Sequence, residues 1–243
     1  MKLFRNLWAR EAPANTVTRP VCHCLDPQYG ESSWTELQIH VERQDTECSG
    51  WQRLNELVDE AVRDERDEFS PGPEMTPTEW TQITELPKSI GELKSVKHLI
   101  LYGSSLVRIP PEIGEMDALE QFTPYTSYRL HWFPYEITRC RKLKNNTVST
   151  RALYGNSKYR APFPKLPQIL AGLPPERCSV CDGRFGEGAP LQCWISLGVG
   201  SDVLPLLVHA CSEHCISKLP RPPTNYVSLP HQGGLNLQQP KSG

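Results

Sequence analysis

The 243-residue sequence predicts an α/β fold in three parts: a short repeat solenoid, a helical cap on its N-terminal side, and a small α+β unit rich in cysteine behind it. Three observations support this prediction. A proline-centred motif recurs with a period typical of solenoids, an amphipathic helix precedes it, and two close pairs of cysteines follow it. The segments are a capping region over 1–75, repeats over 76–160, a proline-rich connector over 161–176, the cysteine-rich unit over 177–220 and a tail over 221–243, which we expect to be disordered.

One amphipathic helix is expected in the capping region, beginning near Ser49. Its apolar side chains recur at helical spacing, and charged side chains occupy the other face. The apolar stripe consists of Trp51, Leu54, Leu57, Val58, Ala61 and Val62. The run Ser70-Pro-Gly-Pro73 ends the helix, which can cover the open end of a solenoid core. Upstream, the alternation from Trp34 to Val41 indicates a short strand.

Each repeat has two apolar residues three positions apart, the second followed by a proline, and then a turn. Ile83-Thr-Glu-Leu86-Pro87-Lys-Ser-Ile90-Gly91 recurs as Leu106-Val-Arg-Ile109-Pro110-Pro-Glu-Ile113-Gly114, and more loosely from Leu130 to Ile137. The prolines at 87, 110 and 134 are 23 and then 24 residues apart. Over about a third of the chain these motifs resemble the leucine-rich repeat family. The resemblance implies that each unit adds one short strand to a parallel sheet on the concave side.

Val96 to Ser104 fits the strand pattern best, with Leu99 and Leu101 pointing inward, because neighbouring side chains of a strand face opposite ways. The asparagine usual in the family is replaced by Ser104 and, in the next unit, by Ser127. Pro124 replaces the second inward leucine of that unit. Since proline has no N–H to donate, we expect the strand to be broken or bulged there.

The predicted concave face mixes aromatic and uncharged polar side chains. Such a surface suits protein recognition, because tyrosine provides a large contact area at a low entropic cost. We therefore expect a protein partner to contact His98, Ile100, Tyr102, Gln121, Thr123, Tyr125, Asn145 and Thr147. The alternative, that these are ordinary solvated strand positions, stays open.

Two cysteine pairs have the spacing of zinc ligands. Cys178 and Cys181 form a Cys-x2-Cys knuckle, and Cys211 and Cys215 follow after 29 intervening residues. Four thiolates can enclose a tetrahedral Zn²⁺ ion in a closed, structural site. Strands are expected at 191–197 and 203–209, and a helix from residue 211. Knuckle, hairpin and helix in this order resemble the treble-clef zinc fingers of the TRASH and MYM type, which implies that the four thiols are the ligands.

Alternatives to this ligand set stay open. His214 is placed to replace Cys215, and His209 to replace Cys211. A redox role for the knuckle is disfavoured, because a redox pair does not require a second cysteine pair. Cys193 is interpreted as a small buried apolar residue. The resemblance to TRASH-type fingers also suggests metal sensing or handling as an alternative function. The role of four upstream residues is undecided: Cys22, His23, Cys24 and Cys48.

A basic stretch over 139–165 provides a second candidate surface. No Asp or Glu occurs between Ile137 and Pro175, and Tyr154 and Tyr159 are interleaved with lysines and arginines. Such a pattern suits nucleic acid, through phosphate neutralisation and base stacking. An anionic protein partner, or pairing with acidic residues of the same chain, satisfies the same pattern.

The remaining features exclude several classes. The formal net charge of −2 gives no information about the kind of partner. No apolar run reaches the length of a membrane helix, and the N-terminal residues lack the pattern of a secretory signal. The motifs of serine hydrolases, phosphate-binding loops and zinc peptidases are absent from the sequence, and no small-molecule substrate is indicated. We therefore expect a cytoplasmic, non-enzymatic protein-interaction module with a structural zinc site, with nucleic-acid binding and metal handling as alternatives.

Overall fold

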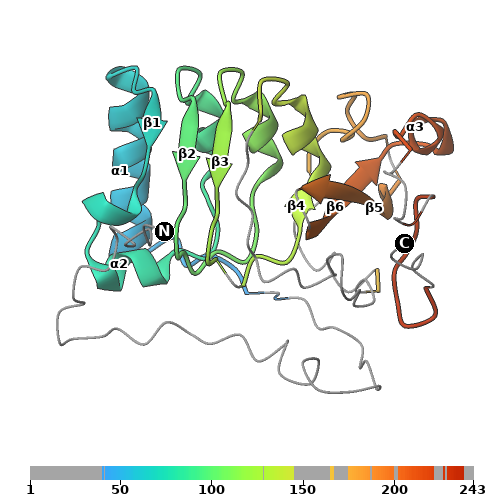
Figure 1. The fold of residues 1–243 in the computed structure, drawn as a ribbon, viewed down its shortest axis with the longest axis horizontal. Helices are drawn as coiled ribbons and strands as arrows, with labels where there is room; N and C mark the ends of the chain where they lie inside the picture. Colours follow the sequence, from blue (N-terminus) through green and yellow to red (C-terminus); the bar gives the residue numbers. More distant parts are fainter. Residues whose placement is uncertain are drawn as a thin grey trace, which may run out of the picture.

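The computed structural model describes residues 40, 42–127, 129–144, 165–166, 175–186, 188–199, 202–221, 227 and 229–237. Its three α-helices are α1 (Ser49–Arg63), α2 (Pro77–Gln82) and α3 (Glu213–Ser217). Its strands are β1 (Glu68–Phe69), β2 (His98–Ile100), β3 (Gln121–Thr123), β4 (Phe133–Pro134), β5 (Leu191–Val199) and β6 (Asp202–Ala210). Helix α1 lies at one end of the molecule, and the β5–β6 hairpin and α3 lie at the other (Figure 1).

Helix α1 confirms the amphipathic pattern. The thiol of Cys48 caps its N-terminus and accepts a hydrogen bond from the backbone N–H of Trp51 at 3.4 Å. Its apolar face packs into the core, with these residues at most 1% exposed: Leu54, Leu57, Val58 and Ala61. Gly50 permits close contact with α2, because a Cβ at that position would lie 2.4 Å from the carbonyl oxygen of Glu79.

Helix α2 begins with a capping box. The hydroxyl of Thr76 accepts from the backbone N–H of Glu79 at 3.2 Å, and the Glu79 carboxylate accepts from the backbone N–H of Thr76 at 2.8 Å. Pro77 occupies the first helical position, where its missing N–H costs nothing. Together these residues start a helix of only six residues directly before the first repeated motif.

Strands β1, β2 and β3 form a parallel sheet in that order. On its inner face Phe69, Leu99 and Phe122 lie in register and are almost fully buried. Leu101, just after β2, is also buried, so the predicted inward direction of Leu99 and Leu101 is confirmed. Strand β3 ends at Thr123, directly before Pro124, as expected from the missing donor of proline.

Three 3-10 turns follow the repeated prolines and pack side by side: η3 (Lys88–Glu92), η4 (Pro111–Glu115) and η5 (Tyr135–Arg139); a further 3-10 turn, η2, covers Gly72–Glu74. Gly91 and Gly114 make this packing close. A Cβ on Gly91 would lie 2.9 Å from the carbonyl oxygen of Glu112, and one on Gly114 would lie 2.5 Å from that of Glu136. Alanine at either position would therefore force the next turn away.

Ser104 and Ser127 form a buried pair. Their hydroxyl oxygens lie 2.7 Å apart, and the Ser127 hydroxyl donates to the carbonyl oxygen of Leu101 at 2.9 Å. The backbone N–H of Ser104 donates to the Ser127 hydroxyl at 3.2 Å. These bonds connect two successive units across their turns, so a serine pair satisfies backbone groups that would otherwise be buried without a partner.

A second sheet has the order β4-β6-β5. Strands β5 and β6 form the predicted hairpin, which extends to Val199 and Asp202 at its turn. Strand β4, from the third repeated motif, pairs in parallel with β6. Residues of the C-terminal segment lie beyond β5, where the backbone groups of Trp194 and His231 exchange hydrogen bonds of 2.8 and 3.1 Å.

The predicted fold class, a short leucine-rich repeat solenoid of α/β type with a treble-clef zinc unit, is therefore wrong. The described residues form three α-helices and two small three-stranded sheets, with no solenoid. One strand of the first sheet, β1, comes from outside the repeats. The third motif contributes β4 to the other sheet instead of extending the first one.

Some predictions concern residues that the structure does not describe. They include most of the strand expected at 34–41, the cysteines and histidine at 22–24, and Asn145 and Thr147 of the partner face. Within the part of the chain that is described, no helix is long and apolar enough to cross a membrane.

Candidate metal centre and binding surfaces

The four predicted cysteines converge at the C-terminal end of the molecule. The sulfur atoms of Cys178, Cys181, Cys211 and Cys215 all lie within 4.8 Å of one another. The Cys181 and Cys211 sulfurs are 3.7 Å apart, and those of Cys211 and Cys215 are 3.5 Å apart. Cys178 and Cys215 are buried, whereas Cys181 and Cys211 are exposed. The group can hold a metal ion and has one accessible side.

A tight turn positions the first pair. The backbone N–H of Cys178 donates to the carbonyl oxygen of Gly183 at 2.8 Å, and that of Asp182 donates back to the Cys178 carbonyl at 3.0 Å. Asp182 has a φ of 60°, in the left-handed region, which lets the chain reverse directly after Cys181. A Cβ on Gly183 would lie 3.4 Å from the Cys181 sulfur, at ordinary van der Waals contact, so the turn passes close beside that thiol.

Strand β6 and helix α3 position the second pair. Cys211 directly follows β6, and Cys215 lies in α3. The hydroxyl of Ser212 caps α3 and accepts from the backbone N–H of Cys215 at 3.3 Å. Because α3 begins at Glu213, two residues after Cys211, its first turn brings Cys215 back beside Cys211.

The thiols differ in how readily they ionise. Burial opposes ionisation of Cys178, but the backbone N–H groups of Cys181, Cys211 and Val180 point at its sulfur, and the net effect lowers its pKa to about 7. Burial and the hydrogen bond with Cys211 raise the pKa of Cys215 to about 12. A metal ion must therefore displace the Cys215 proton before this sulfur can become a ligand.

The arrangement fits a tetrahedral thiolate site. A zinc–sulfur bond of about 2.3 Å gives tetrahedral edges of about 3.8 Å between sulfurs, close to the 3.5 and 3.7 Å separations found. Among the described residues, neither His209 nor His214 belongs to the cluster. Cys193 is 3% exposed and lies in the core, which confirms its interpretation as a buried apolar residue.

Two groups of hydrogen bonds, one with His209 and one with Arg139, attach the knuckle to the rest of the molecule. The backbone N–H of Ser179 donates to the carbonyl oxygen of His209 at 2.8 Å, and the backbone N–H of His209 donates to the Ser179 hydroxyl at 3.0 Å. From η5, the Arg139 guanidinium donates to the carbonyl oxygens of Cys178 and Ser179 at 3.3 and 3.0 Å, and to Asp182 at 3.0 Å. Arg139 belongs to the predicted basic stretch, but that pattern did not indicate its contacts with the knuckle.

The structure brings together six of the eight residues predicted to contact a partner. In the β2–β3 register His98 lies opposite Gln121 and Ile100 opposite Thr123. Beyond the strands, the rings of Tyr102 and Tyr125 stack with centroids 5.8 Å apart and planes 25° apart. The tyrosines are 52% and 39% exposed. We call these six residues the tyrosine face.

Of the basic stretch over 139–165, the structure describes residues 139–144 and 165. Arg139 pairs with Asp182, and Lys144 pairs with Glu120 at 3.0 Å. Its two tyrosines and three of its eight cations, Arg151, Lys158 and Arg160, lie outside the described residues. Two of its described cations thus neutralise carboxylates of the same chain.

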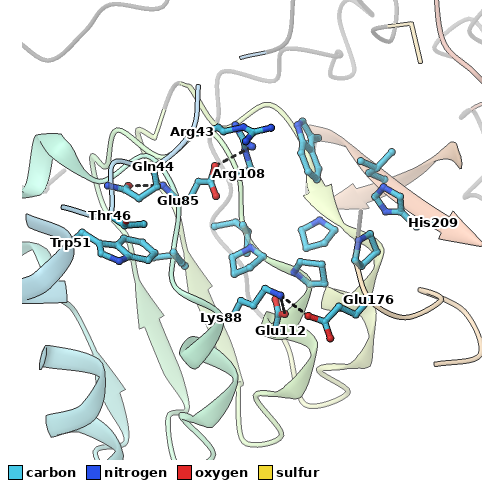
Figure 2. Close-up of a pocket in the computed structure, with 18 residues that line it drawn as sticks. Arg43, Gln44, Thr46, Trp51, Glu85, Lys88, Arg108, Glu112, Glu176 and His209 are labelled. Carbon is cyan, nitrogen blue, oxygen red and sulfur yellow. Dashed lines mark hydrogen bonds and ion pairs between the residues drawn. The ribbon is translucent and has the colours of Figure 1, made fainter. Parts of the chain in front are cut away.

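Sequence reasoning missed a cavity of about 530 Å³ between the segment before α1, the repeated prolines and β6 (Figure 2). Pro110 and Pro134, which define the repeat, line it, as do Trp51 and Trp132. The recurrence of prolines at one position was the available signal, but it was interpreted only as a feature of the repeat.

Comparison with known proteins adds no family. No protein-family model matches the chain, and the curated proteins include no significant match. The resemblances to leucine-rich repeats and to TRASH and MYM-type zinc fingers thus stay predictions from sequence.

Proposed function

We propose that this protein is a non-enzymatic protein-binding module that contacts its partner through the tyrosine face, and whose C-terminal end is held together by a structural zinc ion. The observation that carries the proposal is the stack of Tyr102 and Tyr125, two large rings exposed side by side at the surface of the described structure. Tyrosines are enriched at protein interfaces, because one side chain offers both apolar area and a hydroxyl.

The surroundings of the two rings support protein recognition. Ile100 and Thr123 are partly buried, and His98 bonds to Thr123 at 2.9 Å, which holds the side chains of this face in place. Apart from Glu68, which lies 3.6 Å from His98, the strand positions of this face carry no carboxylate or permanent cation. Little charge must therefore be desolvated when a partner covers it.

A structural role for the metal is supported by its donors and its contacts. Four thiolates leave a zinc ion no open coordination position for a reaction. The cluster joins the knuckle, β6 and α3, and Arg139 links it to η5. Small units with few large apolar side chains depend on such a metal to remain folded.

The partner face is tested with the double variant Tyr102→Ala, Tyr125→Ala. Proteins captured by the wild-type chain should be lost, while the thermal stability changes little because both side chains are exposed. Leu235→Ala, at a residue 52% exposed but outside this face, is the matched control and should retain capture. Unchanged capture by the double variant would show that the partner binds elsewhere.

The zinc site is tested with Cys178→Ser. Native mass spectrometry should show one zinc ion in the wild type and none in the variant, and the variant should unfold at a lower temperature. Cys48→Ser is the control, because serine is a good N-cap and should preserve both metal content and α1. Zinc content equal to wild type in Cys178→Ser would refute the ligand set.

Metal handling is the second candidate, favoured by the exposure of Cys181 and Cys211. A chelator would then remove the metal within minutes from the folded protein, and partner affinity would change. A structural ion instead leaves only as the C-terminal unit unfolds, so the rate of metal loss should equal the unfolding rate measured by tryptophan fluorescence.

A further inference from the structure

The cavity of about 530 Å³ has the size of a ligand site. None of its lining residues belongs to the cysteine cluster or to the tyrosine face. In Figure 2, Trp51 lies on one side and His209 on the opposite side. Arg43, Arg108 and Glu85 gather at one end, and a second charged group gathers at the other. The cavity is therefore a site separate from those described above.

Its middle is apolar. Pro110, Pro111 and Pro134 line it, together with the indoles of Trp51 and Trp132. Trp132 is held by edge-to-face packing on Trp194, with ring centroids 6.3 Å apart. Trp132 is 9% exposed, and its buried indole N–H has no hydrogen-bond partner. A rigid proline and tryptophan lining favours an alkyl chain, and indole faces attract cations.

The charged groups of the cavity are not equally satisfied. Arg108 pairs with Glu85 at 3.0 Å and also donates to the carbonyl oxygen of Glu42. At the other end, Lys88 bonds to Glu176 at 3.0 Å. Both pairs compensate their charges within the chain.

Glu112, beside Lys88, lacks such a close ion pair. Its Oε1 lies 3.9 Å from the Lys88 ammonium, beyond hydrogen-bond distance, and its buried Oε2 has no hydrogen-bond partner. Burial raises the pKa of this carboxyl group. Leaving one buried oxygen of a half-buried carboxylate without a hydrogen bond is costly, and a cation brought into the cavity would relieve that cost.

We infer that this cavity binds a basic side chain of a partner peptide, with its alkyl stem along the prolines and its ammonium or guanidinium group on Glu112. The stem of lysine or arginine is apolar and its end is cationic, which matches an apolar middle with an underpaired carboxylate at one end. An acidic ligand would instead meet Glu112 and Glu176, while Lys88 and Arg108 are already paired and Arg43 lies at the other end of the cavity, near Glu85.

The probes are N-acetyl-lysine N-methylamide and N-acetyl-arginine N-methylamide, titrated into the full-length protein. Binding is followed by the ¹H–¹⁵N signals of the indole N–H groups of Trp51 and Trp132, assigned with Trp→Phe variants. Saturable shifts of both signals are expected. N-acetyl-norleucine N-methylamide, which keeps the stem without the charge, should bind about tenfold more weakly, since it lacks a charge-assisted hydrogen bond.

Glu112→Gln should weaken binding of capped lysine about tenfold, because the amide keeps the shape but loses the charge. Glu115→Gln is the matched control: this exposed residue lies in the same turn, pairs with Lys94, and does not line the cavity. Lys88→Met should strengthen binding roughly threefold by removing a competing cation. Since Lys88 is exposed, this gain can be measured even if Glu112→Gln fails to fold.

Three results would overturn the inference: no saturable shift, equal binding of the norleucine and lysine probes, or unchanged affinity in both Glu112→Gln and Lys88→Met. n-Pentylamine separates a peptide from a free alkylammonium ion. If capped lysine binds about tenfold more tightly than pentylamine, its amide groups are recognised and the peptide assignment holds. Equal affinities would overturn that assignment.

Discussion

Replacing Gly114 with alanine measures how tightly the 3-10 turns are packed. The new Cβ would lie 2.5 Å from the carbonyl oxygen of Glu136 and 2.9 Å from its Cβ. Both atoms are fixed to the backbone of η5, so they cannot swing away as the end of a long side chain can. Turn η5, which also carries Arg139, would have to shift by several tenths of an ångström.

Overpacking of this kind costs about 1–3 kcal/mol. The reduced freedom of the unfolded chain offsets about 0.4–1 kcal/mol of this, because alanine is less flexible than glycine. We therefore expect Gly114→Ala to lower the free energy of unfolding by about 1–2 kcal/mol. For a chain of this size that corresponds to a Tm lower by about 3–6 °C.

The assay is urea unfolding followed by circular dichroism, with two related variants. Gly91→Ala should cost less than Gly114→Ala, because its nearest contacts are 2.9 Å to an oxygen and 3.3 Å to side-chain carbons. Gly186→Ala meets nothing within 4 Å and should be neutral or slightly stabilising. If all three variants were equally stable, the close stacking of the turns would be refuted.

Two further predictions concern the C-terminal half. Arg139→Met removes the contacts to Asp182 and to the knuckle carbonyls, so it should lower stability by about 1–2 kcal/mol and weaken zinc retention in chelator competition. Arg141→Met, at an exposed neighbour, should do neither, and equal effects of the two variants would contradict a role of Arg139 in holding the knuckle. Burial lowers the pKa of His231 from 6.5 to about 4, so its contribution to stability is present above pH 6.5 and is lost as the pH falls towards 4. His231→Gln should reduce that loss by up to about 3 kcal/mol in unfolding series from pH 7 to 4, and identical pH dependence in both proteins would count against it.

Local patterns predicted local structure well. The stripe of α1 was readable because one helix face is buried and the other solvated. The hairpin and the converging cysteines were readable because their spacing is set by short-range geometry. The end of β3 before Pro124 was readable for the same reason, because the missing N–H of proline removes a strand hydrogen bond at that position.

Long-range pairing was not readable in the same way. The third motif looks like the first two, yet its β4 pairs with Leu206 and Leu207 of β6. The local period of the motif does not indicate whether its strand joins the first sheet or pairs with β6. The cavity has the same cause: it is lined by segments between Arg43 and His209 that are close only in the folded chain. The underpaired state of Glu112 depends on which cations its neighbours have already engaged.

The pairing of β4 with β6 also has a consequence for how the protein is made. Phe133 and Pro134 leave the ribosome about 70 residues before their strand partner, and at about 5–20 residues per second this interval lasts several seconds. During that time Phe133, 1% exposed in the finished fold, has no β6 beside it. The nascent chain therefore presents an apolar strand edge that a chaperone can bind. Strand β4 and the turn η5 that follows it complete their packing only late in synthesis.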